Sequence, residues 1–182
     1  MSLPRHPDTR APLQPRLAPV RLQVPRPLAA RIERCARRQA PRECCGLLIG
    51  RLAGPGGDTP PGLPRGIGLL RPGQSAVLTR QVPSPNRAAR PWRRFEIDPE
   101  VLAGALASVR DSRERVLGVY HSHPRGSALP SREDARGAWL GGWLWLIVAP
   151  RAPAGQRWRA WLSVPRAGGF AAVADGSQPR PR

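Results

Sequence analysis

The amino-acid sequence predicts an α/β fold in which one β-sheet is flanked by helices. Segments with a helical apolar period alternate along the chain with short apolar segments of strand length, and no internal repeat interrupts them. The most apolar segment, residues 143–148 (WLWLIV), is typical of a strand that is buried on both faces. A chain of 182 residues has room for one domain with a sizeable hydrophobic core.

Three helices are expected from their apolar spacing and their end residues. The first lies between Pro27 and Pro41, where apolar residues recur at helical spacing among arginines. The second begins at Asp98, which suits an N-cap, with Pro99 at the first helical position. A short third helix is expected to begin at Ser131.

Strands are expected where short apolar segments lie between turn residues. The predicted strands are residues 44–52, 67–70, 76–82, 116–120, 143–148, 158–164 and 169–173. Residues 83–86 (PSPN) are expected to end the third of these strands, and residues 53–66, which are dense in Gly and Pro, are expected to form a loop. The five tryptophans at positions 139, 143, 145, 158 and 161 are expected in the core.

The two ends of the chain differ from its middle. Residues 1–22 are rich in Pro and Arg and have no apolar period, and residues 175–182 are similar. Both are expected to be flexible extensions. One domain is therefore predicted to span residues 23–174.

The large positive charge of the chain says little about its binding partners. The net charge is +18, and all 30 basic residues are Arg. Arg, Pro, Gly and Ala are all abundant and all have GC-rich codons, so coding bias explains the excess and no nucleic-acid partner is expected. Aromatic residues make up only 5% and do not alternate with the arginines. The sequence therefore lacks the aromatic side chains on which the bases of a single-stranded nucleic acid would stack.

Neither a membrane span nor a disulfide scaffold is expected. The longest apolar stretch, residues 138–149, is shorter than the ~20 residues that cross a bilayer. Cys35, Cys44 and Cys45 form no spaced framework, and the N-terminal segment has no signal-peptide core. The adjacent pair cannot form the C-x-x-C unit usual for zinc and is interpreted as two small core residues. A cytoplasmic protein is predicted.

The segment 120–134 (YHSHPRGSALPSRED) carries the candidate site. His121 and His123 are separated by one residue at the end of a predicted strand and therefore point to the same face. Asp134 can add an oxygen ligand, and three protein ligands leave one tetrahedral position of a zinc ion open for water, which is typical of catalytic sites. Ser131 and Asp134 also fit a helix start, where they would cap free amides.

The spacing from His121 to Asp134 resembles the JAMM motif, H-x-H-x7-S-x2-D. The upstream Glu of that motif corresponds to Glu43 in the segment ECCGLL, and residues 93–100 (RRFEIDPE) also resemble the small stand-alone prokaryotic members. The resemblance covers residues 24–173. It implies a single MPN/JAMM-type domain with a mixed β-sheet flanked by helices, layered as in cytidine deaminase.

The resemblance implies a zinc metallopeptidase with one zinc ion per chain. His121, His123 and Asp134 would be the metal ligands. Glu43 would be the general base that takes a proton from water and returns it to the leaving amine, and Ser131 would position the water and stabilise the oxyanion. Read without the resemblance, Glu43 is open to interpretation as an ordinary exposed carboxylate.

The expected substrate is a ubiquitin-like sulfur-carrier protein, cut after Gly-Gly at its C-terminus. An extended tail can add as a strand at a sheet edge, and Gly-Gly would pass a narrow channel because it lacks Cβ atoms. The loop of residues 53–66 is expected to border that groove and to order on binding.

Other functions stay open at this point. An isopeptidase would remove a ubiquitin-like modifier from Lys, whereas a non-catalytic MPN scaffold would lack the metal ligands that this chain keeps. A zinc deaminase would carry H-x-E and P-C-x-x-C signatures, which are absent. A basic nucleic-acid-binding protein would bind in a strongly salt-dependent way.

Overall fold

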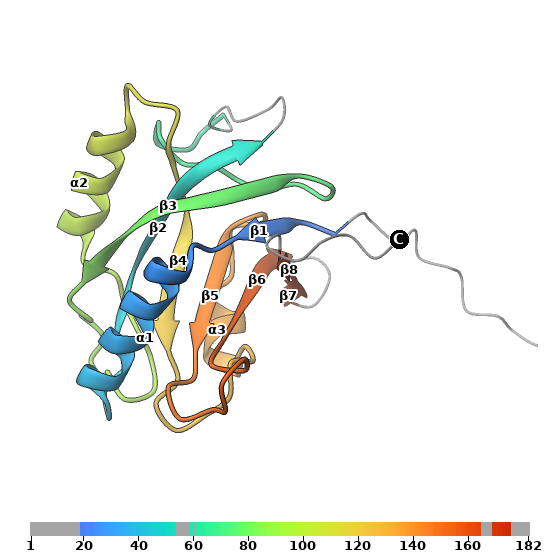
Figure 1. Ribbon diagram of the computed structural model, residues 1–182. Coiled ribbons are helices and arrows are strands. Elements are labelled where there is room, and N and C mark those ends of the chain that lie inside the picture. The colour runs from blue at the N-terminus through green and yellow to red at the C-terminus, as the bar shows by residue number, and fades with distance from the viewer. Residues whose placement is uncertain (1–18, 54–58, 60, 165–168, 176–182) are drawn as a thin grey trace, which may run out of the picture.

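The computed structural model describes residues 19–53, 59, 61–164 and 169–175. Their centre is one eight-stranded sheet in the order β7-β6-β5-β4-β2-β3-β1-β8 (Figure 1). The strands are β1 (Arg21–Gln23), β2 (Cys45–Ala53), β3 (Ser75–Ser84), β4 (Arg115–Ser122), β5 (Leu144–Val148), β6 (Trp158–Val164), β7 (Gly169–Ala172) and β8 (Ala174–Asp175). β4 runs parallel to β5, and β1 runs parallel to β3 and β8, while the other neighbours are antiparallel. The sheet is therefore mixed, as the resemblance implies.

Helices cover both faces of this sheet. They are α1 (Arg26–Gln39), α2 (Pro99–Val109) and α3 (Arg132–Gly137). α1 packs with Leu48 of β2 in one core cluster, whereas α2 packs with Leu47 and Ile49 in a second cluster. Alternate residues of a strand point to opposite faces, so α1 and α2 lie on opposite sides of the sheet. Figure 1 shows α1 in front of the strands and α3 behind them. No helix in the described part of the chain is long and apolar enough to cross a bilayer.

Residues 67–70 do not form the predicted strand. Ile67 makes a single β-bridge to Val116. The pairing with β4 does not continue, because Leu70 donates its backbone N–H to the carbonyl of Gly142 at 2.9 Å. The prediction that residues 83–86 end the preceding strand is confirmed, since β3 ends at Ser84, although it continues through Pro83. β1 pairs with residues 75–77 of β3, and among the described residues no strand covers that edge of β3 further along, where a proline is tolerated.

The sheet begins and ends slightly outside the predicted domain. β1 starts at Arg21, two residues before the expected boundary, because Leu22 is 1% exposed and belongs to the core. β8 reaches Asp175, one residue into the expected tail. Residues 1–18 and 176–182 of the two predicted extensions lie outside the described residues.

The centre of the sheet positions the candidate site. His121 near the end of β4 lies opposite Cys45 at the start of β2 and beside Ile147 of β5. The close approach of β2 and β4 requires a glycine, because a Cβ at Gly46 would lie 2.5 Å from the ring of Tyr120. Residues just before β2 and just after β4 therefore meet at one end of the sheet.

Candidate metal centre

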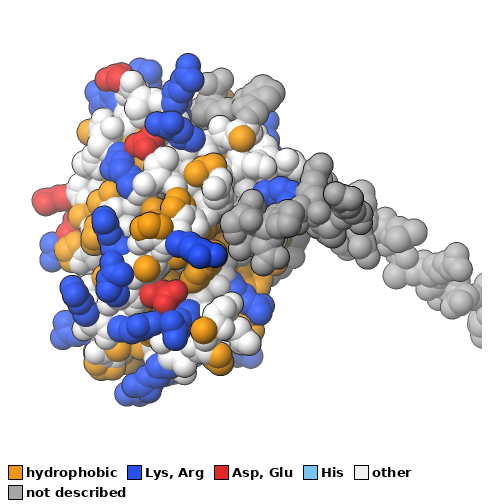
Figure 2. All heavy atoms as spheres, in the orientation of Figure 1, with side chains coloured by type: hydrophobic (Ala, Val, Ile, Leu, Met, Phe, Trp, Pro, Cys, Tyr) orange, Lys and Arg blue, Asp and Glu red, His pale blue; other side chains and the backbone are white. Residues whose placement is uncertain are grey.

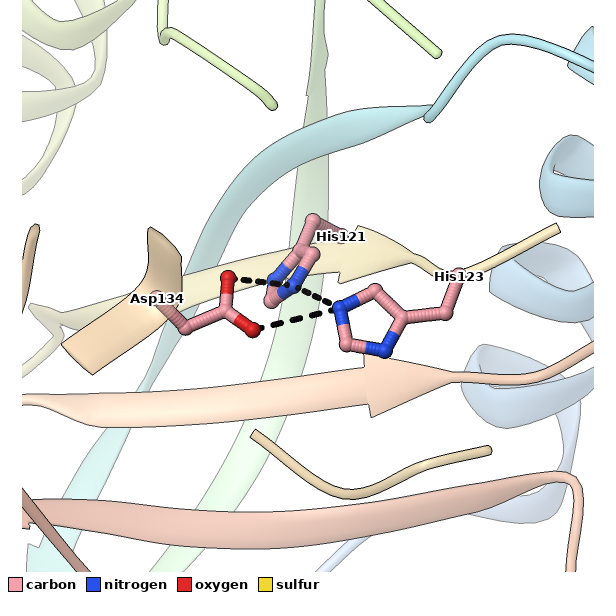
Figure 3. A group of neighbouring side chains, drawn as sticks. All are labelled: His121, His123 and Asp134. Carbon is pink, nitrogen blue, oxygen red and sulfur yellow. Dashed lines mark hydrogen bonds and ion pairs between the residues drawn. The ribbon is translucent and has the colours of Figure 1, made fainter. Parts of the chain in front are cut away.

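Two imidazoles and one carboxylate converge at the end of β4. The Nε2 atoms of His121 and His123 lie 3.0 Å apart, and they lie 3.0 and 3.2 Å from the two carboxylate oxygens of Asp134 (Figure 3). His121 is completely buried, and Asp134 is 6% exposed. Among the described residues this is the group that can hold a metal ion, with ligand atoms within 4.8 Å of one another.

The rings of the two histidines are held in different ways. The Nδ1 of His123 lies 2.9 Å from the carbonyl oxygen of Ser127, so a proton on Nδ1 leaves the Nε2 lone pair free to face the centre. The ring of His121 stacks on Phe95 with centroids 4.3 Å apart, and Trp145 meets it edge-on. The buried Nδ1 of His121 has no hydrogen-bond partner among the described residues.

Charges in this cluster favour an ionised carboxylate. Burial alone would raise the pKa of Asp134, but the hydrogen bonds from His121 and His123 hold that pKa well below its usual range. Burial lowers the pKa of His121 and favours its neutral form, despite the nearby carboxylate. A neutral imidazole and an ionised carboxylate are the forms that bind a divalent cation.

Ser131 holds Asp134 at the start of α3. The Ser131 hydroxyl accepts from the backbone N–H of Asp134 at 3.1 Å, and the carboxylate of Asp134 accepts from the backbone N–H of Ser131 at 2.6 Å. This is a capping box, so the helix-start interpretation and the ligand interpretation of these residues agree. The Ser131 hydroxyl proton is not used by the cap.

Glu43 lies beside this centre and is buried. Glu43 is only 6% exposed, so its interpretation as an ordinary exposed carboxylate is wrong. Burial raises the pKa of Glu43 to about 7, while nearby His123 lowers it and nearby Asp134 raises it. The following residue, Cys44, donates its backbone N–H to the hydroxyl of Ser122, which lies between the two histidines, at 2.9 Å. The Glu43 segment is thereby attached to β4.

A further segment, residues 86–97, encloses Glu43 from the other side and is called the lip. Asn86 organises it, because its side-chain amide donates to the carbonyls of Glu43 and Arg94, each at 3.0 Å. The side-chain oxygen of Asn86 accepts from the backbone of Ala88 and Glu96 at 3.0 and 3.1 Å. The lip also accepts the backbone N–H of Glu43 at the carbonyl of Pro91.

Two cavities of different character adjoin the centre. The apolar cavity, about 460 Å³, touches Asp134 and is lined mainly by apolar residues, including Leu63, Trp139 and Trp145. Trp139 is 75% exposed, so the prediction that it belongs to the core is wrong. The basic cavity, about 900 Å³, is lined by Glu43, His123 and Ser131 together with many arginines. Of the loop at 53–66, residues 54–58 and 60 lie outside the described residues.

The structure thus brings together all five residues that the sequence analysis singled out. It also adds three that sequence reasoning missed, namely Phe95, Asn86 and Ser122. Phe95 lies in the segment 93–100, which was noted only for its family resemblance, and Asn86 lies in the segment expected to end a strand. Ser122 is the variable position between the two histidines of the motif, so nothing in the sequence singled it out. The cysteines next to Glu43 are buried thiols without a disulfide, in agreement with their interpretation as core residues.

Residues 25–163 match the family described as prokaryotic homologs of the JAB domain. The chain is similar to a desampylase from Haloferax volcanii, with 33% identity over 97 residues that make up 53% of this chain and 68% of the relative. It is also similar to a probable TtuB-protein conjugate cleaving protease from Thermus thermophilus, with 31% identity over 117 residues, 64% of this chain and 63% of the relative.

Solved structures show the same fold. The solution structure of protein DSY2949 from Desulfitobacterium hafniense has a TM-score of 0.63 and 26% sequence identity, and covers 86% of this chain and 90% of its own. A protein from Salinibacter ruber has a TM-score of 0.53 at 22% identity, over 88% of this chain and 95% of its own. These likenesses span nearly the whole described chain and support one α/β domain.

Proposed function

Because this chain belongs to the prokaryotic JAB-domain family and is a JAMM-type hydrolase, we propose that it uses one zinc ion to cleave the peptide bond after Gly-Gly in a ubiquitin-like sulfur-carrier protein. The family and the fold inferred from the motif are confirmed. The observation that supports the proposed activity best is the convergence of His121, His123 and Asp134 beside a buried Glu43. The names of the relatives, a desampylase and a conjugate cleaving protease, support a ubiquitin-like substrate.

His121, His123 and Asp134 would hold the zinc ion, because the two Nε2 atoms and the two carboxylate oxygens converge and the Asp134 carboxylate is ionised. Bound there, zinc would supply a Lewis acid that makes water nucleophilic at neutral pH. Glu43 takes the proton of the attacking water and returns it to the leaving nitrogen, and a pKa of about 7 suits a group that must both accept and donate.

The Ser131 hydroxyl can donate a hydrogen bond while it caps α3. Its oxygen accepts from the backbone of Asp134, so its hydroxyl proton can be donated to the substrate carbonyl oxygen as negative charge develops there. The same residue therefore holds a ligand and stabilises the oxyanion.

The substrate tail cannot add to β4 itself, the strand that carries the histidines, whereas addition at an edge of the sheet stays a prediction. β4 is paired with β2 at His121 and with β5 at the same residue, so it has no free edge there. We propose that the tail lies instead between the lip and the apolar cavity, where Leu63 and Trp139 can receive apolar side chains that precede Gly-Gly. The end of the 53–66 loop borders that cavity.

The test is mass spectrometry of a sulfur carrier with a short C-terminal extension. Wild type should release the residues after Gly-Gly, and chelation should stop the reaction. Glu43→Gln keeps the size of the side chain and removes the base, so we expect zinc content near that of wild type and a rate lower by roughly 10². Full activity of Glu43→Gln would contradict the assigned base.

The isopeptidase alternative has its own outcome in the same experiment. Cleavage of a Lys-linked conjugate, with no cleavage of extended carriers, would replace the proposed bond by an isopeptide bond. A zinc-loaded protein that cuts neither substrate would support the non-catalytic scaffold. The cytoplasmic location stays a prediction.

A further inference from the structure

We infer that the basic cavity is the leaving-group site and that it selects an acidic segment after the scissile bond, bound through Asp or Glu side chains. This inference rests on the proposed function and names the chemistry of the part of the substrate that is released. It begins with the side of the centre on which Glu43 lies.

Glu43 determines which cavity receives the leaving group. During hydrolysis the water oxygen bonds to the carbonyl carbon, the C–N bond breaks, and the water proton passes through Glu43 to the leaving nitrogen. The leaving nitrogen must therefore lie within reach of Glu43. Glu43 lines the basic cavity and not the apolar one, which is lined by Asp134. Residues that follow the scissile bond therefore enter the basic cavity.

Arginines from three separate segments line this cavity. They come from the lip, from the loop after His123 and from α3, and are Arg90, Arg93, Arg94, Arg125, Arg132 and Arg136. Six of its seventeen lining residues are thus arginines, about twice the share that arginine has in the whole chain. Arginines are also scattered over the face seen in Figure 2, so abundance alone is no argument, but their convergence around Glu43 is a local enrichment.

Carboxylates of the protein offset only part of this positive charge. Glu133 pairs with Arg94 at 3.5 Å and with Arg136, and the other acidic lining residues are Glu43 and Glu96. Across the described residues, no ion pair engages the four remaining arginines, which are Arg90, Arg93, Arg125 and Arg132. Guanidinium groups bind carboxylates in a planar, two-pronged geometry, so an acidic peptide is the matching ligand.

A nucleic acid is the other anionic polymer that this surface could attract. Trp92, which is 57% exposed, lines the cavity and offers one stacking platform. The cavity is, however, also lined by His123, Ser131 and Glu43, and a proton carrier such as Glu43 suits an amide bond, whose leaving nitrogen must be protonated. The observations therefore favour a peptide, and an oligonucleotide becomes a competitor in the test.

Binding is measured first, because it needs no catalysis. A labelled hexapeptide with a free N-terminus and three Asp residues is compared by fluorescence anisotropy with its Asn counterpart, on zinc-loaded protein. We expect roughly tenfold tighter binding of the Asp peptide, lost in Arg93→Gln/Arg125→Gln and weakened by salt. The matched control is Arg31→Gln/Arg34→Gln, which removes two exposed arginines of α1 on the other side of the sheet and should bind like wild type.

Cleavage is measured second, on carriers extended after Gly-Gly by Asp-Asp or Asn-Asn. The Asp-Asp carrier should have the lower KM at similar kcat, and Arg125→Glu should shift the preference towards Lys-Lys. Equal binding of the two peptides, equal loss in both double variants, or tighter binding of a single-stranded oligonucleotide of the same charge would overturn the inference. Acid-selective binding without cleavage of any carrier would overturn the proposed function alone.

Discussion

The two walls of the catalytic centre are built in different ways. One wall, β4 to α3, is a single stretch of chain that supplies His121, His123 and Asp134, with Ser131 capping the helix. The other wall consists of Glu43 and the lip, which are separated by more than 40 residues in sequence and meet through the side chain of Asn86. The first wall is held by local geometry and the second by tertiary contacts.

The two walls have different tasks, namely metal binding and proton transfer. The β4–α3 wall places the lone pairs and the ionised carboxylate that a metal ion needs, and its members contact one another directly. The wall with Glu43 places the proton carrier and the positively charged lip, and it contacts the first wall through hydrogen bonds such as the one from the backbone N–H of Cys44 to the hydroxyl of Ser122. Damage to the first wall should therefore change metal content and activity together, whereas damage to the second should change activity alone.

The largest expected effect comes from His123→Ala in the first wall. Loss of one of three protein ligands should remove most of the zinc, and with it several kcal/mol of transition-state stabilisation, so the rate should fall by roughly 10³ or more. Elemental analysis and a cleavage assay measure the two quantities on the same samples. Glu43→Gln is the matched control, because it should keep its zinc. Wild-type zinc content in His123→Ala would contradict the ligand assignment.

Ser131 gives a smaller effect that sharpens the comparison within the first wall. Ser131→Ala removes the cap and should cost about 1 kcal/mol in the free energy of unfolding, whereas Ser131→Gly should cost only a few tenths. Both variants lose the hydroxyl donor, so both should lower kcat by roughly 10², the usual effect of one oxyanion donor. Ser131→Thr keeps the hydroxyl and serves as the control. If activity follows stability across the three variants instead, Ser131 is a cap and nothing more.

The same division explains how much of the site could be predicted from the sequence. The helices and most strands follow from local periodicity, and the spacing from His121 to Asp134 identifies the first wall within fifteen residues. No local pattern indicates that Glu43 is buried. Its place beside the histidines depends on the pairing of Cys45 with His121 across β2 and β4, so only the family resemblance identified it.

Other features could not be read from the chain because they arise from packing. The segment at 67–70 has the composition of a strand, but its backbone finds partners in two different neighbours after one bridge. The apolar tryptophans suit a core, yet Trp139 lies at the rim of a cavity. Asn86 stands in a segment rich in proline, where it indicates a break in a strand, and its four hydrogen bonds to Glu43 and the lip are visible only once Glu43 is in place.

Asn86 therefore provides the last and smallest test of the second wall. Asn86→Ala removes the donors to Glu43 and Arg94 as well as the acceptor for Ala88 and Glu96. A net hydrogen bond is worth about 1 kcal/mol, so loosening the hold on Glu43 should lower kcat by roughly tenfold, with zinc content unchanged.

Asn86→Asp separates the two halves of this role. It keeps the acceptor oxygen, so the turn of the lip around Ala88 and Glu96 should survive, but it cannot donate to the carbonyl of Glu43. If the hold on Glu43 is what matters, Asp and Ala should be equally slow, although only Ala also removes the acceptor for Ala88 and Glu96. Hydrogen exchange of residues 86–97 reports the lip, and single-turnover cleavage reports the proton carrier. An active Asn86→Asp with an inactive Asn86→Ala would instead show that the shape of the lip, and not the tie to Glu43, limits the reaction. A loss of zinc in either variant would contradict the independence of the two walls.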